Sequence, residues 1–420
     1  HPHPAIPDPL WSRGLGDVYK RQDNVCKELK DLGCELIISP NGSPFDKYKI
    51  NQRKTIIEDR VTEVKTPFVY VNQFGGQDEL VFDGSSLAMN GNKEVVFEAP
   101  SWEENTSVVE FNVSAKKFND LPFEKAQVSD LENIYMAMVI GLRDYVTKNN
   151  FPGVILGLSG GIDSAFCAAV AVDALGKDKV NAYMLPSVYT SKNSLDDAKD
   201  CAKRLEIHLD SIPISNTFLS LEDSLEELFK GLPTDITEEN LQSRIRGTIL
   251  MAISNKIGKM LITTGNKSEV SVGYSTLYGD MNGGFNPIKD IYKTELYALA
   301  NWRNLNVPKN VLLTKKNIIP ETIISKEPTA ELRDNQKDSD SLPSYDQLDQ
   351  ILEGLVEYEL STNELESKGF SRDEIKKVEN LLYVSEYKRR QSAPGVKISL
   401  RNFGRDRRYP ITNKYRDKSE

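Results

Sequence analysis

A run of small polar residues between two apolar segments is the part of this sequence best suited to chemistry. It reads GLSGGIDS and comprises Gly157, Leu158, Ser159, Gly160, Gly161, Ile162, Asp163 and Ser164. The apolar stretch 153–158 predicts a buried strand, and 163–175 predicts an apolar helix. N–H groups at a helix start are unpaired, glycines let an oxyanion come close, and serine hydroxyls add donors. The loop therefore predicts a phosphate site, and Asp163 offers the carboxylate that Mg²⁺ prefers.

Two common nucleotide motifs are excluded at this loop. It lacks the lysine of the GxxxxGK[ST] phosphate loop, and it does not match the GxGxxG pattern of dinucleotide-binding folds. A generic strand-to-helix turn, which also favours Gly and Ser, is the structural alternative. The complete SGGIDS string between an apolar strand and an apolar helix favours the phosphate site.

SGGIDS resembles the pyrophosphate-binding loop of the ATP-pyrophosphatase superfamily. That group includes NAD synthetases, GMP synthetases, asparagine synthetases and tRNA-thiolating enzymes. The resemblance implies that a substrate oxygen is activated as an adenylate, with release of pyrophosphate. The loop alone does not select the substrate.

Four later segments resemble NAD synthetases, and the last of the four resembles the carboxy-terminal tail of their glutamine-dependent branch. They are the central block TTGNKSEVSVGYSTLYGDMNGGFNPIKDIYKTELYALA (263–300), the helix ENLQSRIR (239–246), the loop and helix PTAELRDNQKDSDSLPSYDQLDQIL (328–352) and the tail KRRQSAPGVKISLRNFGRDRRYPITN (388–413). The resemblance covers about 123–416. It implies ATP-dependent amidation of deamido-NAD (nicotinic acid adenine dinucleotide) to NAD, with AMP and pyrophosphate released. The implied cofactors are ATP and Mg²⁺.

The resemblance also implies roles for single residues. Besides the loop, Thr264, Lys293 and Thr329 are expected to contact ATP, Asp163 and Glu269 to bind Mg²⁺, and Asp163 and Lys293 to serve catalysis. The residues expected to bind deamido-NAD are Asn240, Gln242, Arg244, Glu269, Asp280 and Lys388. Plainer readings stay open: Glu269 as a helix cap, Arg244 and Arg246 as surface ion pairs, and Tyr274 and Tyr278 as packing groups rather than stacking surfaces.

The first third of the chain carries a second resemblance. CELIISPNGSPFDKYKINQR (34–53) resembles the nitrilase-type glutaminase domain that precedes the synthetase in this branch, and Ser43 and Lys49 match its glutamine pocket. The position of the family's nucleophilic cysteine falls within 1–22, which reads as a cloning or assembly artefact. Cys26 and Cys34 lie in patterns that predict structural roles. We therefore expect an inactive glutaminase and ammonia as the nitrogen donor.

The order of predicted elements indicates the fold class. From residue 130, strands alternate with helices over 130–149, 163–175, 194–205, 217–230 and 238–257, which predicts an α/β fold with a doubly wound parallel sheet. A polar, mobile loop over 326–345 and a helix pair, 345–357 and 371–386, follow. Residues 23–118 predict an incomplete α+β domain with one surface helix. The expected divisions are an artefactual segment 1–22, a truncated nitrilase-like domain 23–122 and a synthetase domain 123–420.

Composition limits the classes of protein that fit. The 420 residues hold 62 acids and 53 bases, a net charge of −9, which argues against a chain that coats nucleic acid. No apolar run approaches the roughly 18 residues of a membrane span. Four scattered cysteines and three histidines predict neither a disulfide framework nor a zinc site. A cytoplasmic protein without membrane or nucleic-acid partners is expected.

Two other functions stay open. The basic tail 387–416 would suit a superfamily member that modifies tRNA, although the cysteine pair of a thiolating enzyme is absent. An inactive chain that associates with full-length subunits is the second. For the synthetase, the resemblance implies a homodimer or larger homo-oligomer, and the helices 130–149 and 238–257 are candidates for its interface.

Overall fold

The computed structural model describes residues 24–119, 128–333, 336–340 and 342–413. The chain divides into two compact units, one within residues 1–140 and the other within residues 141–420. The division falls inside helix α4 (Asp130–Lys148). The segment 1–22 and the boundary expected after residue 122 lie outside the described residues and stay predictions.

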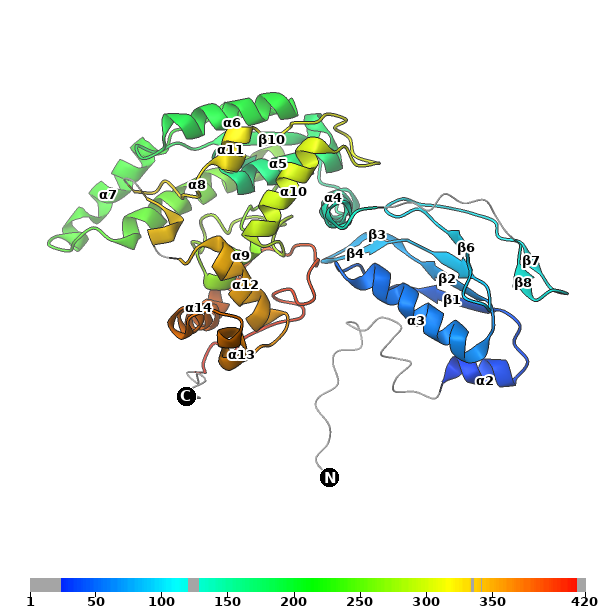
Figure 1. The fold of residues 1–420 in the computed structure, drawn as a ribbon. Helices are drawn as coiled ribbons and strands as arrows, with labels where there is room; N and C mark the ends of the chain where they lie inside the picture. The colour runs from blue at the N-terminus through cyan, green and yellow to red at the C-terminus, as the bar shows by residue number, and fades with distance from the viewer. Residues whose placement is uncertain (1–23, 120–127, 334–335, 341, 414–420) are drawn as a thin grey trace. The chain divides into compact units, whose positions relative to one another are not determined.

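The first unit is built on a four-stranded sheet in the order β1-β2-β5-β6 (Figure 1). Strands β1 and β2 pair in parallel, whereas β2 with β5 and β5 with β6 are antiparallel. The α+β character predicted for this region is thereby seen directly. Its elements are α2 (Val25–Asp31), β1 (Ile37–Asn41), α3 (Lys49–Val64), β2 (Phe68–Asn72), β3 (Phe74–Gln77), β4 (Leu80–Asp83), β5 (Leu87–Met89), β6 (Val95–Glu98), β7 (Phe111–Asn112) and β8 (Lys117–Phe118).

Helix α3 packs one face against this sheet. Ile57, Val61 and Val64 are buried at the spacing of one helical face, in one cluster with Phe68 and Met89. The prediction of a surface helix was therefore half right: the apolar stripe and the charged Arg53 are buried, whereas residues such as Asp59 and Glu63 are exposed.

The second unit contains a parallel sheet in the order β11-β10-β9-β12. Its strands are β9 (Val154–Gly157), β10 (Val180–Met184), β11 (His208–Ser211) and β12 (Met260–Leu261). The parallel α/β sheet predicted from the alternation of elements is confirmed. Strand β12 is only two residues long, and Ile262 after it makes a single bridge to Phe285. Thr263 and Thr264 thus lie in irregular backbone at the carboxyl edge.

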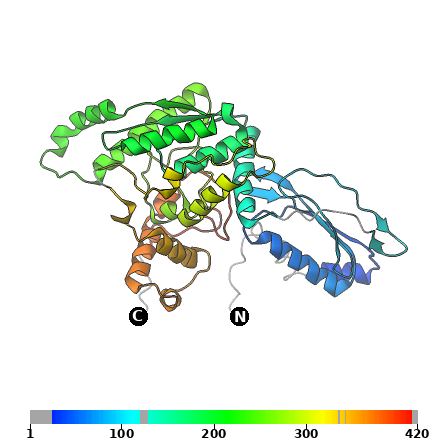
Figure 2. The ribbon, with the colours of Figure 1, turned by 45° about the horizontal axis from the view of Figure 1, so that its top comes forward.

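Helices cover both faces of this sheet (Figures 1 and 2). Helices α5 (Ile162–Leu175) and α6 (Lys192–Leu205) pack on one face, where α5 contacts β9 and β10. On the other face, α8 (Ile236–Ile257) packs Ile249 and Leu250 against Ile155 and Leu261. Because side chains alternate along a strand, Val154 and Leu156 point from β9 toward α5. The strand that leads into the phosphate loop is therefore buried on both faces.

A helical cluster completes the second unit. Its core joins α9, α12, α13 and α14 with the tail residues Phe403 and Tyr409. Helix α13 was missed from the sequence, because six residues carry too little periodicity to be recognised. The remaining elements are α7 (Ser215–Phe229), α9 (Lys267–Val272), α10 (Lys293–Leu305), α11 (Glu321–Ser325), α12 (Tyr345–Val356), α13 (Thr362–Ser367), α14 (Arg372–Val384), α15 (Glu386–Arg389) and the 3₁₀ turns η2 (Lys177–Lys179) and η3 (Asp338–Asp340).

A buried ion pair fixes α10 against α5. Arg303, which is 0% exposed, donates from Nε to Asp173 Oδ2 at 2.7 Å and from Nη2 to Asp173 Oδ1 at 3.1 Å. Its remaining donors reach backbone carbonyls such as that of Leu313. Since α5 carries Asp163 and α10 carries Lys293, this pair helps to set the distance between them. Among the described residues, no helix is both long and apolar enough to cross a membrane.

Candidate active site

The phosphate loop between β9 and α5 depends on Gly160. Its φ is +83°, and a Cβ there would lie 2.2 Å from the carbonyl oxygen of Ser194 on α6. Both the left-handed backbone and the close packing exclude a side chain. The glycine predicted to admit an oxyanion is therefore required for packing against α6. Next to it, Gly161 caps α5 without any side-chain cap, which leaves the N–H groups of the first turn for a ligand.

The two serines of the loop hold its shape. Ser159 and Ser164 join their hydroxyls at 3.1 Å, and the N–H of Gly161 donates to Ser159 Oγ at 3.2 Å. The hydroxyl of Ser164 also donates to the carbonyl of Gly161 at 3.1 Å. The loop is thus preorganised before any anion arrives.

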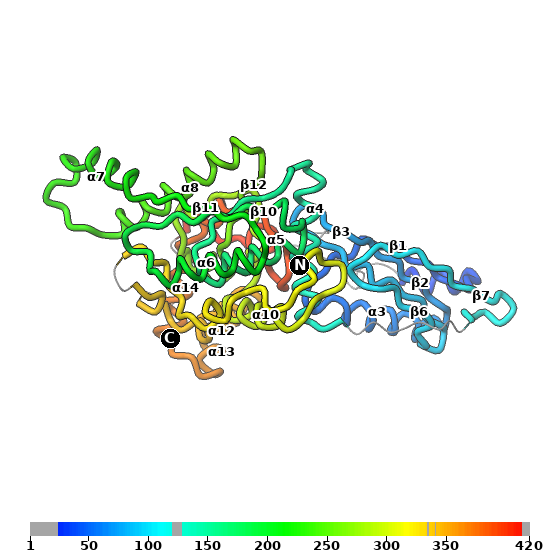
Figure 3. Tube along the Cα trace, turned by 90° about the horizontal axis from the view of Figure 1, so that it is seen from above, coloured from blue at the N-terminus to red at the C-terminus, as the bar shows by residue number. Residues whose placement is uncertain are grey.

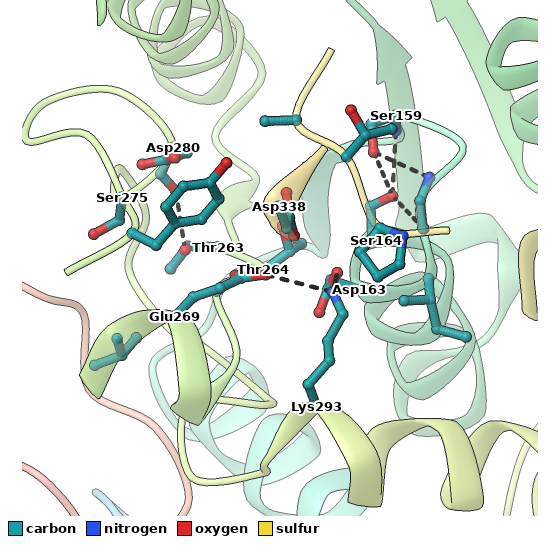
Figure 4. A pocket seen from close by; sticks show the side chains of 18 of the residues that line it. Ser159, Asp163, Ser164, Thr263, Thr264, Glu269, Ser275, Asp280, Lys293 and Asp338 are labelled. Carbon is teal, nitrogen blue, oxygen red and sulfur yellow. Dashed lines mark hydrogen bonds and ion pairs between the residues drawn. The ribbon is translucent and has the colours of Figure 1, made fainter. Parts of the chain in front are cut away.

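Two carboxylates and one lysine meet at the start of α5 (Figure 4). Lys293 Nζ lies 2.5 Å from Asp163 Oδ2 and 3.4 Å from Glu269 Oε1. All three side chains are largely buried, at 3%, 19% and 17% exposed for Lys293, Asp163 and Glu269. Asn266, the N-cap of α9, donates to Asp163 Oδ1 at 2.7 Å. Residues 130 positions apart in the chain are therefore held in direct contact.

The charges in this cluster are strongly perturbed. Burial, with the nearby Asp163 carboxylate, raises the pKa of Glu269 to about 8. Burial alone would lower the pKa of Lys293, but Asp163 and Glu269 outweigh it and raise that pKa above its ordinary value. Lys293 therefore stays an ammonium throughout the physiological range. A buried carboxylate that resists ionisation gains most from a cation placed beside it.

The cluster has the character of a Mg²⁺ site that a phosphate ligand completes. Asp163 and Glu269 contact Lys293 in one cavity, and Asp338 is a third carboxyl group in the lining of that cavity. Within the described ranges, no group of three or more His, Cys, Asp or Glu residues forms a metal cage made of protein alone. Mg²⁺ is commonly held by one or two carboxylates, with waters and substrate phosphates as its other ligands. The residues present fit that pattern.

Most of the residues predicted to bind ATP line two adjoining cavities. The first, of about 230 Å³, is lined by Ser159, Gly161, Ile162, Asp163, Ser164, Thr264, Glu269, Asp280, Lys293 and Thr329 among others. The second, of about 280 Å³, is bordered by Gly157 and Leu158 and shares Ser159, Ser164 and Thr264. Its walls include the apolar residues Met184, Leu185, Leu250 and Leu261. A charged cavity thus continues into one with apolar walls.

Four residues predicted to bind deamido-NAD lie behind the loops rather than in the cavity lining. Asn240 accepts from Thr276 Oγ1 at 2.9 Å, and Arg244 Nε donates to the Leu277 carbonyl at 3.2 Å. These contacts place both residues on one face of α8, as predicted. Lys388 Nζ donates to the carbonyls of Gly273 and Ser275, each at 2.7 Å. Gln242 Nε2 donates to the Leu332 carbonyl at 2.9 Å. Their contact with a substrate stays a prediction.

The segment 326–333, predicted as part of a mobile loop, is hydrogen-bonded beside the phosphate loop. Glu331 accepts from the hydroxyls of Ser191 at 2.8 Å and Ser194 at 2.6 Å. Thr329 donates to the carbonyl of Gln336 at 2.6 Å. The segment therefore supplies part of the wall of both cavities.

Sequence reasoning missed several residues of this site. Arg246 lines the second cavity and donates to the Leu185 carbonyl at 2.9 Å, and burial lowers its pKa to about 10, so it is not a surface ion pair. Asn266 was detectable as an N-cap three residues before Glu269. Glu331 and Asp338 carried no local signal, since only the tertiary fold brings their segment to the cavity. Tyr274 lines the first cavity, whereas Tyr278 is 63% exposed.

The residues predicted to form a glutamine pocket, Ser43 and Lys49, belong to the first unit. Ser43 is buried and accepts from Arg53 Nε at 3.0 Å, while Arg53 Nη1 pairs with Asp83 at 2.7 Å. Lys49 begins α3. Cys26 lies in the core, where burial raises the pKa of its thiol, and Cys34 donates to the Leu36 carbonyl at 2.9 Å. The structural role expected of both cysteines stays a prediction.

The sequence was compared with family models and with known proteins. The family model described as NAD synthase matches residues 134–392. The glutamine-dependent NAD(+) synthetase of Rhodobacter capsulatus is 48% identical over 94% of this chain and 72% of the relative. The enzyme of the same name from Acinetobacter baylyi is 45% identical, over 94% of this chain and 71% of the relative.

A solved structure agrees with these sequences. The glutamine-dependent NAD+ synthetase of Acinetobacter baumannii, in complex with adenosine diphosphate, superposes with a TM-score of 0.69 at 42% identity. The likeness covers 93% of this chain and 70% of that one. Because sequence and structure agree over nearly the whole chain, the likeness includes both units.

Proposed function

The chain belongs to the NAD synthase family, as a relative of its glutamine-dependent members, and on that premise we propose how its residues carry the reaction. The family makes it a ligase that forms a carbon–nitrogen bond with the use of ATP. The substrate we propose is deamido-NAD. The observation that carries the proposal is the contact of Asp163, Glu269 and Lys293 in one cavity beside the phosphate loop.

In the proposed first step, deamido-NAD is activated. A carboxylate oxygen of its nicotinate forms a bond to the α-phosphorus of ATP, and the bond from that phosphorus to the pyrophosphate oxygen breaks. The phosphates lie on the N–H groups of the α5 start and on the hydroxyls of the loop. Lys293 faces the charge that builds on the leaving pyrophosphate. Asp163 and Glu269 would hold Mg²⁺, which supplies further charge neutralisation when bound.

The adenosine of ATP fits the second cavity in this proposal. Its apolar walls, Leu185 and Leu250 among them, suit an aromatic ring, and its floor is the Gly157 end of β9. In a parallel α/β sheet, ligands gather at the carboxyl ends of the strands, where Gly157 and Thr264 lie. Deamido-NAD then approaches from the side of the 273–280 loop, which Asn240, Arg244 and Lys388 hold in place.

The second step forms the amide. The nitrogen of ammonia bonds to the carbonyl carbon of the adenylate, and the carbon–oxygen bond to AMP breaks with its electrons on the phosphate oxygen. The products are NAD, AMP and one proton.

The nitrogen donor of the 420-residue polypeptide is expected to be ammonia. Two observations support this proposal: Cys26 is buried in the core, and the Cys34 thiol donates to a backbone carbonyl. We expect NAD from ATP, Mg²⁺, deamido-NAD and ammonium, and none when glutamine replaces ammonium. Chromatographic measurement of NAD and AMP tests this. Glutamine-dependent NAD that disappears in Cys26→Ser or Cys34→Ser would contradict it.

Helix α7 supports a homodimer or larger homo-oligomer. Its side chains are not buried in this unit, and Leu219, Leu228 and Phe229 are exposed. In Figures 1 and 3 it lies at the edge of the second unit. Large apolar side chains left exposed on a helix are typical of a subunit contact. We expect light scattering to give at least twice the chain mass, and Leu228→Glu to lower it. A monomer mass for the unmodified chain would contradict the assembly.

A further inference from the structure

A carboxyl group without an assigned role lines the charged cavity. Asp338, the first residue of η3, is 6% exposed and lines the same cavity as Asp163, Glu269 and Lys293 (Figure 4). Its Oδ2 accepts from Tyr345 Oη at 2.8 Å. Its Oδ1 is buried and has no hydrogen-bond partner among the described residues. An acceptor in that position is costly unless a ligand supplies the missing donor.

Two tyrosines lie beside this carboxyl group. Tyr274 interacts with the same carboxyl group, and the ring of Tyr345 lies 5.4 Å from Lys293 Nζ. Tyr345 therefore contacts both Asp338 and the lysine of the reacting cluster. Although three carboxyl groups line the cavity, the described residues contain no metal-ligand cluster of three. A single free acceptor oxygen on a carboxyl group that already accepts from a phenol suits a small N–H donor better than a third ligand of a metal ion.

We propose that Asp338 binds the ammonia that attacks the adenylate and accepts the proton that its nitrogen loses. This rests on the proposed function, because it assigns a residue to the second step. The nitrogen forms its bond to the carbonyl carbon, and one N–H proton passes to Asp338 Oδ1. The carbon–oxygen bond to AMP breaks, and its electron pair leaves on the phosphate oxygen. Atoms and charges balance without a further reactant.

The energetics agree with this assignment. Burial raises the pKa of Asp338, an effect that Tyr345 and Lys293 oppose. A carboxylate of raised pKa is a better proton acceptor than an exposed one. Activation of deamido-NAD releases no N–H proton, so this first step does not require the carboxylate. The two steps should therefore respond differently to its removal.

Asp338→Asn separates the two steps experimentally. The amide still accepts from Tyr345 but cannot take a proton. Activation is measured as deamido-NAD-dependent exchange of labelled pyrophosphate into ATP without ammonia. We expect exchange within about threefold of the unmodified chain, and NAD formation with ammonium lowered about 100-fold, the usual range of general base catalysis. Hydroxylamine, which forms a more acidic adduct that loses its proton to water, should be affected less.

The matched control is Asp340→Asn. Asp340 belongs to the same η3 turn, is exposed and pairs with Arg333, and its replacement should leave both measurements unchanged. Exchange that falls with NAD formation in Asp338→Asn would overturn the proposal, because Asp338 would then serve activation. Unchanged NAD formation would overturn it as well. An unmodified chain without any exchange would instead contradict the proposed function.

Discussion

Asp163→Asn is expected to lower NAD formation about a thousandfold, at the upper end of losses seen when one preorganised electrostatic group is removed. The side chain keeps its size, but its charge is lost. Lys293 Nζ, 2.5 Å from Asp163 Oδ2, then loses the partner that fixes it, and only Glu269 at 3.4 Å remains. The proposed Mg²⁺ site loses one of its two carboxylates. Pyrophosphate exchange should fall as far as NAD formation, because the loss is in activation.

Two controls accompany this variant. Asp196→Asn removes an exposed carboxylate from α6, where Lys199 is 3.9 Å away, and should leave the rate unchanged. The double variant with Lys293→Met should be hardly slower than either single variant, since groups that act as a unit are not additive. If the effects of the two substitutions were strictly additive, or if Asp163→Asn kept a rate within tenfold of the unmodified chain, Asp163 would not take the proposed part in the reaction.

Lys267→Met is expected to have the largest effect on stability. Lys267 is 0% exposed, and its Nζ lies 2.9 Å from Asp290 Oδ1 and 3.0 Å from Glu357 Oε1. It also donates to Ser399 Oγ at 2.6 Å. Removing the ammonium leaves two buried carboxylates without a counter-charge, which costs about 3–5 kcal/mol of unfolding free energy. The midpoint of urea unfolding measures it, with the exposed Lys256→Met on α8 as the control.

The pH dependence of this loss has a definite sign. Although burial raises the pKa of Asp290, Lys267 and two backbone N–H groups hold it below its ordinary value. In the unmodified chain Asp290 therefore stabilises the fold at neutral pH, and this contribution is lost as pH falls. Without Lys267, burial dominates, and protonation of Asp290 relieves the folded state on acidification. The stability difference should be smaller at about pH 5 than at about pH 8; a constant difference would contradict the ion-pair explanation.

Lys267 also links stability to the site. It begins α9, directly after Asn266, which holds Asp163, and two residues before Glu269. A charge network buried beneath the cluster thus fixes the helix that carries one carboxylate and orients the other. The activity of Lys267→Met should therefore be lower than the fraction of folded protein alone explains.

Local chemistry made part of this site predictable. The loop 157–164 needs only a strand, two glycines and a helix start, all adjacent in sequence, so its position and Asp163 followed from the pattern. Lys293 and Glu269 were identified through the family resemblance, because their contact with Asp163 depends on the whole sheet. Asp338 and Glu331 could not be found, since their segment lacks periodicity and is positioned only by tertiary hydrogen bonds.

Gly160 also shows which features the local sequence could not predict. Gly160 was correctly singled out as part of the loop, but the reason was incomplete. Its side-chain position is closed by the Ser194 carbonyl of α6, 34 residues later in the chain, which no local pattern reveals. Backbone approach between distant elements can be seen only in the fold.

The central claim, that the nicotinate carboxylate of deamido-NAD attacks the α-phosphorus of ATP in this cavity, is tested most directly by following oxygen. Deamido-NAD labelled with ¹⁸O in its carboxylate is converted to NAD with ATP, Mg²⁺ and ammonium. The ¹⁸O content of AMP and pyrophosphate is then measured by mass spectrometry. The claim predicts that one ¹⁸O appears in AMP and none in pyrophosphate. AMP without ¹⁸O, or label found in phosphate or pyrophosphate, would contradict it.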